Sequence, residues 1–487
     1  MSLREVFVRT AQADLVKGIE VPIVDGECTA LVGESGSGKS LTALAIMDLL
    51  PSGLRAEGIG LSEIQSKRRA MVFQEPMTAL NPTMRVGAQI VEAAIARGDS
   101  PAEAKATALS WMSRVQIPEV EKSFNKYPHQ MSGGQRQRIM IAMAMAQRPE
   151  LLIADEPTTA LDHAVAHEIL ALLRALQRET GMAMLFISHD LDAVAAVADH
   201  VVVLQKGTVV ESASASQLLQ HPVHPYTQGL LASRPPLDRK PLRLPTVQDF
   251  LEGQPLSHEE RPVFKGKTPI LEVKELSKTY GGQKVFHDLA LVLHEGETLG
   301  LVGASGSGKS TIAKCMVNLV HPDGGEIRYR GQRIDGLNRA GRQAMAREIQ
   351  YIFQDPFSSL SPRMTIGEAI REPMVVHGLY GSPNDQRTKV EELLSAVGLP
   401  VEAYDRYPHA FSGGQRQRIG IARTLALQPK VVICDESVAA LDVSVQAQVL
   451  NLLNDLKDRF QFSYLFISHD ERVVRYMSDR TVVLGKG

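Results

Sequence analysis

The sequence predicts an α/β fold in which two similar domains follow one another along one chain. Apolar runs of four to six residues alternate with longer stretches of helical periodicity, which favours a largely parallel sheet covered by helices. The octapeptide pattern G-x-x-x-x-G-K-S occurs at residues 33–40 and again at 303–310. Further motifs recur 280 residues apart, as in Gln74 and Gln354. We therefore expect a first domain at 1–232, a Pro-rich linker at 233–268 and a second domain at 269–487.

The offset between the repeats changes from 270 residues at Gly33 and Gly303 to 280 residues at Gln74 and Gln354. The first half therefore lacks ten residues between its octapeptide and Gln74. The stretch 51–60 is short beside the one that follows Pro322. We expect the difference to remove a strand or hairpin at the rim of the first domain.

Each octapeptide follows an apolar, strand-like run and precedes a helix-like one. Glycines let successive backbone N–H groups converge on phosphate oxygens, and the following helix presents its positive end. The loop residues expected to bind phosphate are Gly33, Ser35, Gly36, Gly38, Gly303, Ser305, Gly306 and Gly308. Lys39 and Lys309 would reach the β- and γ-phosphates, and the hydroxyls of Ser40 and Ser310 would coordinate Mg²⁺. The sequence thus predicts two sites for ATP and Mg²⁺.

Two further pairs of apolar strands end in chemically active residues. Residues 151–154 and 431–434 are each followed by two acids, of which the first can hold Mg²⁺ and the second can orient the attacking water. These acids are Asp155 and Asp435 as metal ligands, and Glu156 and Glu436 as catalytic residues. His189 and His469 follow another strand in register, where an imidazole could bond the γ-phosphate and respond to its loss.

Composition excludes several classes of protein. The 53 basic and 55 acidic residues give a net charge of −2, so no nucleic-acid partner is expected. The three cysteines, Cys28, Cys315 and Cys434, lie in apolar stretches without pair spacing and are predicted to be reduced core residues. The N-terminus shows no signal-peptide pattern, and no run of about 18 apolar residues predicts a membrane span.

The most specific pattern opens two helix-like runs between the strands. Ser132-Gly133-Gly134-Gln135 and Ser412-Gly413-Gly414-Gln415 combine a serine N-cap with glycines that leave helix N-terminal amides open to an anion. With a phosphate loop upstream and the acid pair downstream, this pattern resembles the signature of ATP-binding-cassette (ABC) ATPases. The resemblance covers nearly the whole chain in two copies. It implies two P-loop NTPase domains, each with a RecA-like core sheet and a helical signature subdomain, and assigns the signature residues to nucleotide binding.

The same resemblance implies further roles. Gln74 and Gln354 match the loop that touches the metal and the nucleophilic water, and residues 161–162 and 441–442 match the D-loops. In such cassettes two nucleotides are sandwiched head to tail, which would pair Lys39 with the second signature and Lys309 with the first.

An aromatic residue stacks on adenine in this family. Tyr280, 23 residues before Gly303, matches it, whereas Thr10 is its counterpart in the first half. Stacking is worth on the order of 1 kcal/mol. The first site is expected to hold the base more loosely, unless Phe7 substitutes.

Finer features resemble importers of the oligopeptide/dipeptide type: the stretches 74–82 and 354–362, Tyr-Pro-His at 127–129 and 407–409, and the tail motif at 224–231. The fused arrangement resembles bacterial importers of peptides, glutathione or microcin-like peptides. The resemblance implies two membrane permeases, an external solute-binding protein and a place on the cytoplasmic face of the inner membrane. Because residues 232–268 contain no cysteine, no iron–sulfur cluster is expected.

Two alternatives remain open at this point: a soluble tandem cassette of the translation or DNA-repair type, and an accessory ATPase of a phosphonate-cleaving complex. The translation type usually carries a long charged helical linker and the repair type carries zinc-binding cysteines, and neither pattern occurs in this sequence.

Overall fold

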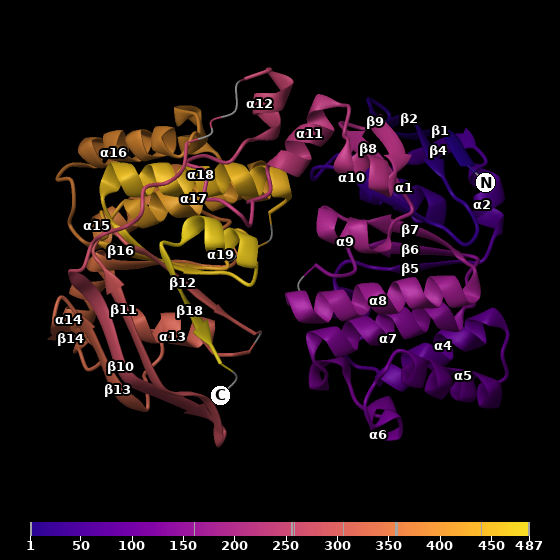
Figure 1. Ribbon diagram of the computed structural model, residues 1–487, viewed down its shortest axis with the longest axis horizontal. Helices are drawn as coiled ribbons and strands as arrows, with labels where there is room; N and C mark the ends of the chain where they lie inside the picture. Colours follow the sequence, from indigo (N-terminus) through magenta and orange to yellow (C-terminus); the bar gives the residue numbers. More distant parts are fainter. Residues whose placement is uncertain are drawn as a thin grey trace. The chain divides into compact units, whose positions relative to one another are not determined.

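The computed structural model describes residues 2–159, 161–254, 257, 259–304, 306–355, 359–439 and 441–485. The chain divides into two compact units (Figure 1). The first unit comprises Met1–Leu231 and Val247–Gln254, and the second comprises Ala232–Thr246 and Pro255–Gly487.

The first unit is built on a six-stranded sheet in the order β5-β6-β7-β3-β8-β9, parallel except for the edge strand β9. An antiparallel sheet in the order β2-β1-β4 accompanies it. Strands β3, β6 and β7 are buried at every position, as expected for parallel strands covered on both faces. The strands are β1 (Ser2–Arg9), β2 (Asp14–Pro22), β3 (Cys28–Val32), β4 (Arg55–Ile59), β5 (Arg69–Val72), β6 (Leu151–Asp155), β7 (Ala183–Ile187), β8 (His200–Gln205) and β9 (Thr208–Ser214).

Helices α4, α5 and α7 of the first unit pack on one another, and α7 also packs on α8 (Figure 1). Neighbouring residues of β7 serve different cores, because Phe186 joins one apolar cluster and Leu185 the other. The helices are α1 (Lys39–Met47), α2 (Leu61–Ser66), α3 (Pro76–Ala79), α4 (Val86–Arg97), α5 (Pro101–Arg114), α6 (Val120–Phe124), α7 (Gly133–Ala146), α8 (His163–Thr180), α9 (Leu191–Val197), α10 (Ala215–Gln220), α11 (Pro225–Ala232) and α12 (Val247–Leu251).

The second unit repeats this plan with a parallel sheet in the order β15-β16-β17-β12-β18 and an antiparallel sheet in the order β11-β10-β13-β14. Its strands are β10 (Pro269–Tyr280), β11 (Gln283–His294), β12 (Thr298–Gly303), β13 (Gly324–Tyr329), β14 (Gln332–Arg333), β15 (Ile349–Ile352), β16 (Val431–Asp435), β17 (Ser463–Ile467) and β18 (Arg480–Leu484). Its helices are α13 (Lys309–Met316), α14 (Arg339–Glu348), α15 (Ile366–Val376), α16 (Pro383–Ala396), α17 (Gly413–Leu425), α18 (Val443–Phe460) and α19 (Glu471–Met477).

The predicted α/β architecture is confirmed in both units. The ten-residue length difference between the halves lies before the strand that leads to Gln74, where the sequence predicted the loss of a strand or hairpin. In the second unit, strands β13 and β14 form a hairpin before α14, whereas in the first unit β4 leads directly into α2.

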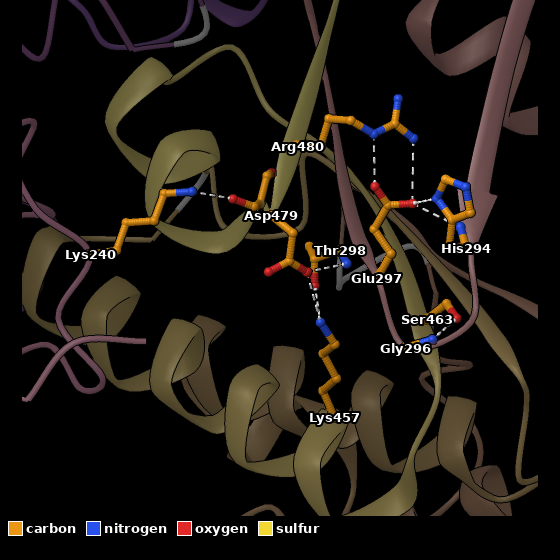
Figure 2. Close-up of polar contacts among 10 residues, drawn as sticks. Lys240, His294, Gly296, Glu297, Thr298, Lys457, Ser463, Asp479 and Arg480 are labelled. Carbon is orange, nitrogen blue, oxygen red and sulfur yellow. Dashed lines mark hydrogen bonds and ion pairs between the residues drawn. The ribbon is translucent and has the colours of Figure 1, made fainter. Parts of the chain in front are cut away.

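The start of the Pro-rich stretch, which belongs to the second unit, makes specific contacts with the rest of that unit. The amide of Leu244 donates to Asn451 Oδ1 (2.9 Å), and Asn451 Nδ2 donates back to the Leu244 carbonyl (2.8 Å). Lys240, labelled in Figure 2, donates from its Nζ to the carbonyl of Ser478 (2.6 Å). Within the described parts of the chain, no helix is both long and apolar enough to cross a membrane.

Candidate nucleotide sites

In each unit, a central parallel strand leads through the octapeptide loop into a helix. The loop turns into the helix at Gly38 and Gly308, whose φ angles of 105° and 91° lie in the left-handed region that favours glycine. Lys39 Nζ donates to the carbonyls of Gly33 (2.7 Å) and Glu34 (2.8 Å), and Lys309 Nζ donates to the equivalent carbonyls of its own loop. Both lysines are buried, so each loop encloses a positive charge where the sequence predicts phosphate.

The predicted Mg²⁺ ligands also lie together. Ser40 Oγ donates to Asp155 Oδ1 (3.4 Å), and Ser310 Oγ donates to Asp435 Oδ1 (3.0 Å). Burial raises the pKa of Asp155, against the opposing effects of the Ser40 hydrogen bond and the Lys39 charge. Hydroxyl and carboxylate oxygens are the ligands that Mg²⁺ prefers, so these residues fit that ion.

The two glutamates predicted to be catalytic occupy an unusual backbone position one residue beyond their strands. Glu156 and Glu436 have φ angles of 47° and 48°, which side-chain-bearing residues rarely adopt. Their amides donate to the carbonyls of Ile187 and Ile467 (both 2.9 Å), so the neighbouring strand holds each turn in place.

Each glutamate is the centre of a hydrogen-bonded cluster. Gln74 Nε2 donates to Glu156 Oε2 (2.9 Å), and His189 Nδ1 lies 3.1 Å from Glu156 Oε1. In the second unit, Gln354 Nε2 donates to Glu436 Oε2 (2.8 Å), and His469 Nδ1 lies 3.5 Å from Glu436 Oε1. The structure therefore brings together the three catalytic residues that the sequence predicted for each site.

In each cluster, the surroundings favour the negatively charged form of the glutamate and the positively charged form of the histidine. Burial raises the pKa of Glu156, but the hydrogen bond and charge of His189 outweigh this effect, so the pKa is lowered overall. The hydrogen bond from His469 is the main cause of the lowered pKa of Glu436. Burial lowers the pKa of His189, yet the hydrogen bond and charge of Glu156 raise it above its usual value. Ionised glutamates of this kind can accept a hydrogen bond from a water molecule.

Two contacts that sequence reasoning missed make the sites unequal. Thr159 Oγ1 donates to Glu156 Oε2 (3.1 Å), whereas the counterpart in the second half is Ala439. The hydroxyl of Tyr351 donates to Asp435 Oδ2, whereas the counterpart in the first half is Met71. Comparing the halves at the 280-residue offset could have revealed both differences.

The signature residues begin helices α7 and α17, as predicted. Ser132 Oγ accepts from the Gln135 amide (3.3 Å), and the Ser132 amide donates to Gln135 Oε1 (3.1 Å). Ser412 and Gln415 form the same reciprocal capping box. The second glycine has an additional packing role, since a Cβ at Gly134 would lie 2.6 Å from Cγ1 of Val165.

The predicted base-stacking residue lies at the end of β10. Tyr280 is half exposed, and Lys278 Nζ lies 5.2 Å from the centroid of its ring. Thr10 instead shapes a turn, because its Oγ1 accepts from the amides of Gln12 (3.1 Å) and Ala13 (2.9 Å). Phe7 packs beneath Gly18, with the Arg9 guanidinium 4.3 Å from its centroid. Ser305, also predicted to bind phosphate, lies outside the described residues.

A further pair of residues holds the strands that lead into the loops. Asp479 Oδ2 accepts from the amide of Thr298 at the start of β12 (2.7 Å), and Lys457 Nζ lies 3.3 Å from the same oxygen (Figure 2). In the first unit, Asp199 Oδ2 accepts from the Cys28 amide at the start of β3 (2.8 Å). The hydrogen bond from Arg174 is the main cause of the lowered pKa of Asp199. An aspartate side chain thus holds the start of both strands.

Comparison with known proteins agrees with this geometry. Residues 16–159 and 286–439 match the family described as ABC transporter, and residues 210–260 match the oligopeptide/dipeptide transporter C-terminal region. The Glutathione import ATP-binding protein GsiA of Shigella boydii serotype 4 (strain Sb227) is 45% identical over 515 aligned residues, covering 97% of this chain and 82% of that protein. The protein of the same name from Escherichia coli (strain K12) has the same identity and coverage.

A solved structure described as RNase-L Inhibitor is 21% identical, with a TM-score of 0.65 over 99% of this chain and 89% of that one. This likeness shows a shared tandem fold. The family matches, the close relatives and the duplicated site together give one conclusion: the chain belongs to the ABC transporter family, as an ATP-hydrolysing subunit of the oligopeptide/dipeptide type with two cassettes in one polypeptide.

Proposed function

We propose that this chain binds and hydrolyses ATP at both sites to power the import of peptides or of glutathione. It would act on the cytoplasmic face of the bacterial inner membrane, with two permease subunits and an external solute-binding protein. The observation that carries the proposal is the duplicated cluster of glutamine, glutamate and histidine beside a buried aspartate that accepts a hydrogen bond from a serine hydroxyl. The names of the 45% identical relatives support the direction of transport and the class of substrate.

The residues that would hold Mg²⁺ are Ser40, Asp155 and Gln74 in the first unit and Ser310, Asp435 and Gln354 in the second. When bound, the ion would neutralise charge on the phosphate oxygens during hydrolysis. Lys39 and Lys309 would exchange their carbonyl partners for phosphate oxygens. Glu156 and Glu436 would orient the attacking water, and the signature residues of both domains would contribute further nucleotide contacts.

A cavity in the second unit supports a permease contact next to the glutamine loop. It has a volume of about 380 Å³ and lies among β15, α15 and α17. Its lining includes Phe353, Glu372, Val376, His377 and Arg423. Phe353 directly precedes the catalytic Gln354, so a segment inserted here would lie close to the hydrolytic cluster.

The ATPase part of the proposal is tested with Glu156→Gln, Glu436→Gln and the double variant. Glutamine keeps the size of the side chain but loses the carboxylate charge, so ATP should stay bound while turnover falls by about 10² or more in the double variant. Glu63→Gln on α2 is the matched control. Unchanged turnover in both single variants and in the double variant would contradict the assignment.

The transport part is tested by purification from membranes. The chain should co-purify with two membrane permeases, and the reconstituted complex should accumulate glutathione or short peptides in an ATP-dependent way. Stable association with ribosomes, with DNA or with a soluble enzyme complex would overturn the proposed role.

A further inference from the structure

A hydrogen bond joins the C-terminal tail motif of the first unit to its phosphate loop. The amide of Glu34, the second residue of the octapeptide, donates to the hydroxyl of Tyr226 (3.0 Å). The two residues are 192 positions apart in sequence, and Tyr226 is fully buried. The tail therefore reaches the part of the cassette that would bind phosphate.

The tail around Tyr226 is itself firmly attached. The carboxylate of Glu211 on β9 accepts from the amides of Val223 (2.9 Å) and His224 (3.0 Å). The Tyr226 amide donates to Nδ1 of His224 (3.1 Å). Gly229 faces the backbone of Val247 so closely that a Cβ would lie 2.7 Å from Val247 Cα. Since β9 belongs to the same sheet as β3, the tail and the loop share one rigid support.

The loop end of the contact lies next to Lys39, the lysine predicted to bind phosphate. The carbonyl of Glu34 accepts from Lys39 Nζ (2.8 Å) and from the Ser37 amide (3.1 Å). One residue is thus bonded to the tail through its N–H group and to the phosphate-binding lysine through its carbonyl. A shift of this residue would move the position that Lys39 occupies before ATP arrives.

We propose that Tyr226 is a positioning residue for ATP binding at the first site, through which the tail motif holds the phosphate loop in its binding conformation. The proposal rests on the proposed role of Lys39 in binding ATP. A fixed loop would not have to be ordered by the nucleotide, so the hydroxyl would act on affinity more than on the hydrolytic step.

The test uses the full chain with Lys309→Ala, so that only the first loop keeps its lysine. In this background, Tyr226→Phe removes the hydroxyl while keeping the ring in the core. We expect ATP·Mg²⁺ to bind about fivefold more weakly and the KM to rise by a similar factor, with kcat changed less than twofold. Glu211→Gln, which weakens the attachment of the tail without touching the loop, should shift KM in the same direction by a smaller factor.

Tyr464→Phe in the same background is the matched control. It removes another fully buried hydroxyl, one that donates to the carbonyl of Leu453 (3.2 Å), and should leave ATP affinity unchanged. Fluorescence of Trp111, the only tryptophan of the chain, checks that the first unit stays folded in every variant.

Unchanged ATP affinity in folded Tyr226→Phe would overturn the inference, and so would an equal loss in Tyr464→Phe. If Tyr226→Phe fails to fold, unchanged KM in Glu211→Gln would overturn it instead. Lys39→Ala in the same background separates this inference from the proposed function. If Lys39→Ala still binds ATP, the proposed role of Lys39 is refuted. If Lys39→Ala loses ATP binding but Tyr226→Phe binds ATP with unchanged affinity, only the inference about Tyr226 is refuted.

Discussion

At the scale of single residues, the hydroxyl of Tyr351 distinguishes the predicted Mg²⁺ site of the second domain from that of the first. It donates to Asp435 Oδ2, and Ser310 bonds the other carboxylate oxygen, so the carboxylate is held on both sides. Groups that orient a metal ligand typically contribute to metal affinity. Tyr351→Phe should therefore raise the Mg²⁺ concentration for half-maximal ATPase activity by roughly threefold, because a single hydrogen bond contributes a small free energy.

Magnesium titration of steady-state ATPase measures this effect. Tyr329→Phe is the control, because its hydroxyl donates to Glu348 (2.8 Å), a residue outside the predicted site. An identical Mg²⁺ requirement in Tyr351→Phe and wild type would refute the orienting role of Tyr351.

The histidine–glutamate pair of the first domain predicts a pH-dependent contribution to stability. Because the folded-state pKa of His189 is raised above the unfolded value of about 6.5, its stabilisation is fully present below that pH and is lost as the pH rises through the folded pKa. The urea midpoint gap between wild type and His189→Gln, followed by Trp111 fluorescence, should be larger near pH 6 than near pH 8.5.

His200 provides a control of opposite sign in the same unit. Burial lowers the pKa of His200, so protonation of this residue below about pH 6.5 destabilises the folded state. The urea midpoint of wild type minus that of His200→Gln should therefore be smaller near pH 6 than near pH 8.5, opposite to the trend for His189→Gln. The same trend in both variants would argue against the His189–Glu156 pair as the cause.

The site residues that the sequence pointed to are those marked by repeated local motifs. Spacing placed Gln74, Glu156 and His189 at the ends of parallel strands, and their side chains do meet. The bond from Glu34 to Tyr226 joins positions 192 residues apart, and no local pattern indicates such a pairing. The left-handed backbone conformation of Glu156 also could not be predicted from the sequence, because it depends on the hydrogen bond to Ile187 of the neighbouring strand.

At the scale of elements, the start of α7 depends on close packing against α8. A Cβ on Gly134 would lie 2.6 Å from Cγ1 of Val165, whereas a Cβ on Gly133 would meet Cδ2 of Leu161 at an ordinary 3.6 Å. Gly134→Ala should therefore lower the free energy of unfolding of the first unit by about 1–3 kcal/mol through overpacking. Gly133→Ala should cost much less.

Urea unfolding followed by Trp111 fluorescence measures both variants. Adding Val165→Ala to Gly134→Ala opens the space that the new methyl group needs, so the double variant should be more stable than the sum of the two single effects predicts. Strict additivity would show that the helices do not clash at this point.

Across the whole molecule, the two predicted ATP sites share the glutamine, glutamate and histidine of their clusters but differ in the residues around them. The second has Tyr280 as its predicted base-stacking residue and Tyr351 on its aspartate, and the Ser310 hydroxyl lies closer to Asp435 (3.0 Å) than the Ser40 hydroxyl lies to Asp155 (3.4 Å). With stacking worth about 1 kcal/mol, roughly a factor of five in affinity, ATP should bind more tightly to Lys39→Ala, which keeps the second loop, than to Lys309→Ala. Equilibrium binding of ATP·Mg²⁺ to the two full-length variants measures the difference. Adding Tyr280→Thr to Lys39→Ala should remove most of the difference, whereas equal affinities before that change would show that Tyr280 does not contact the base.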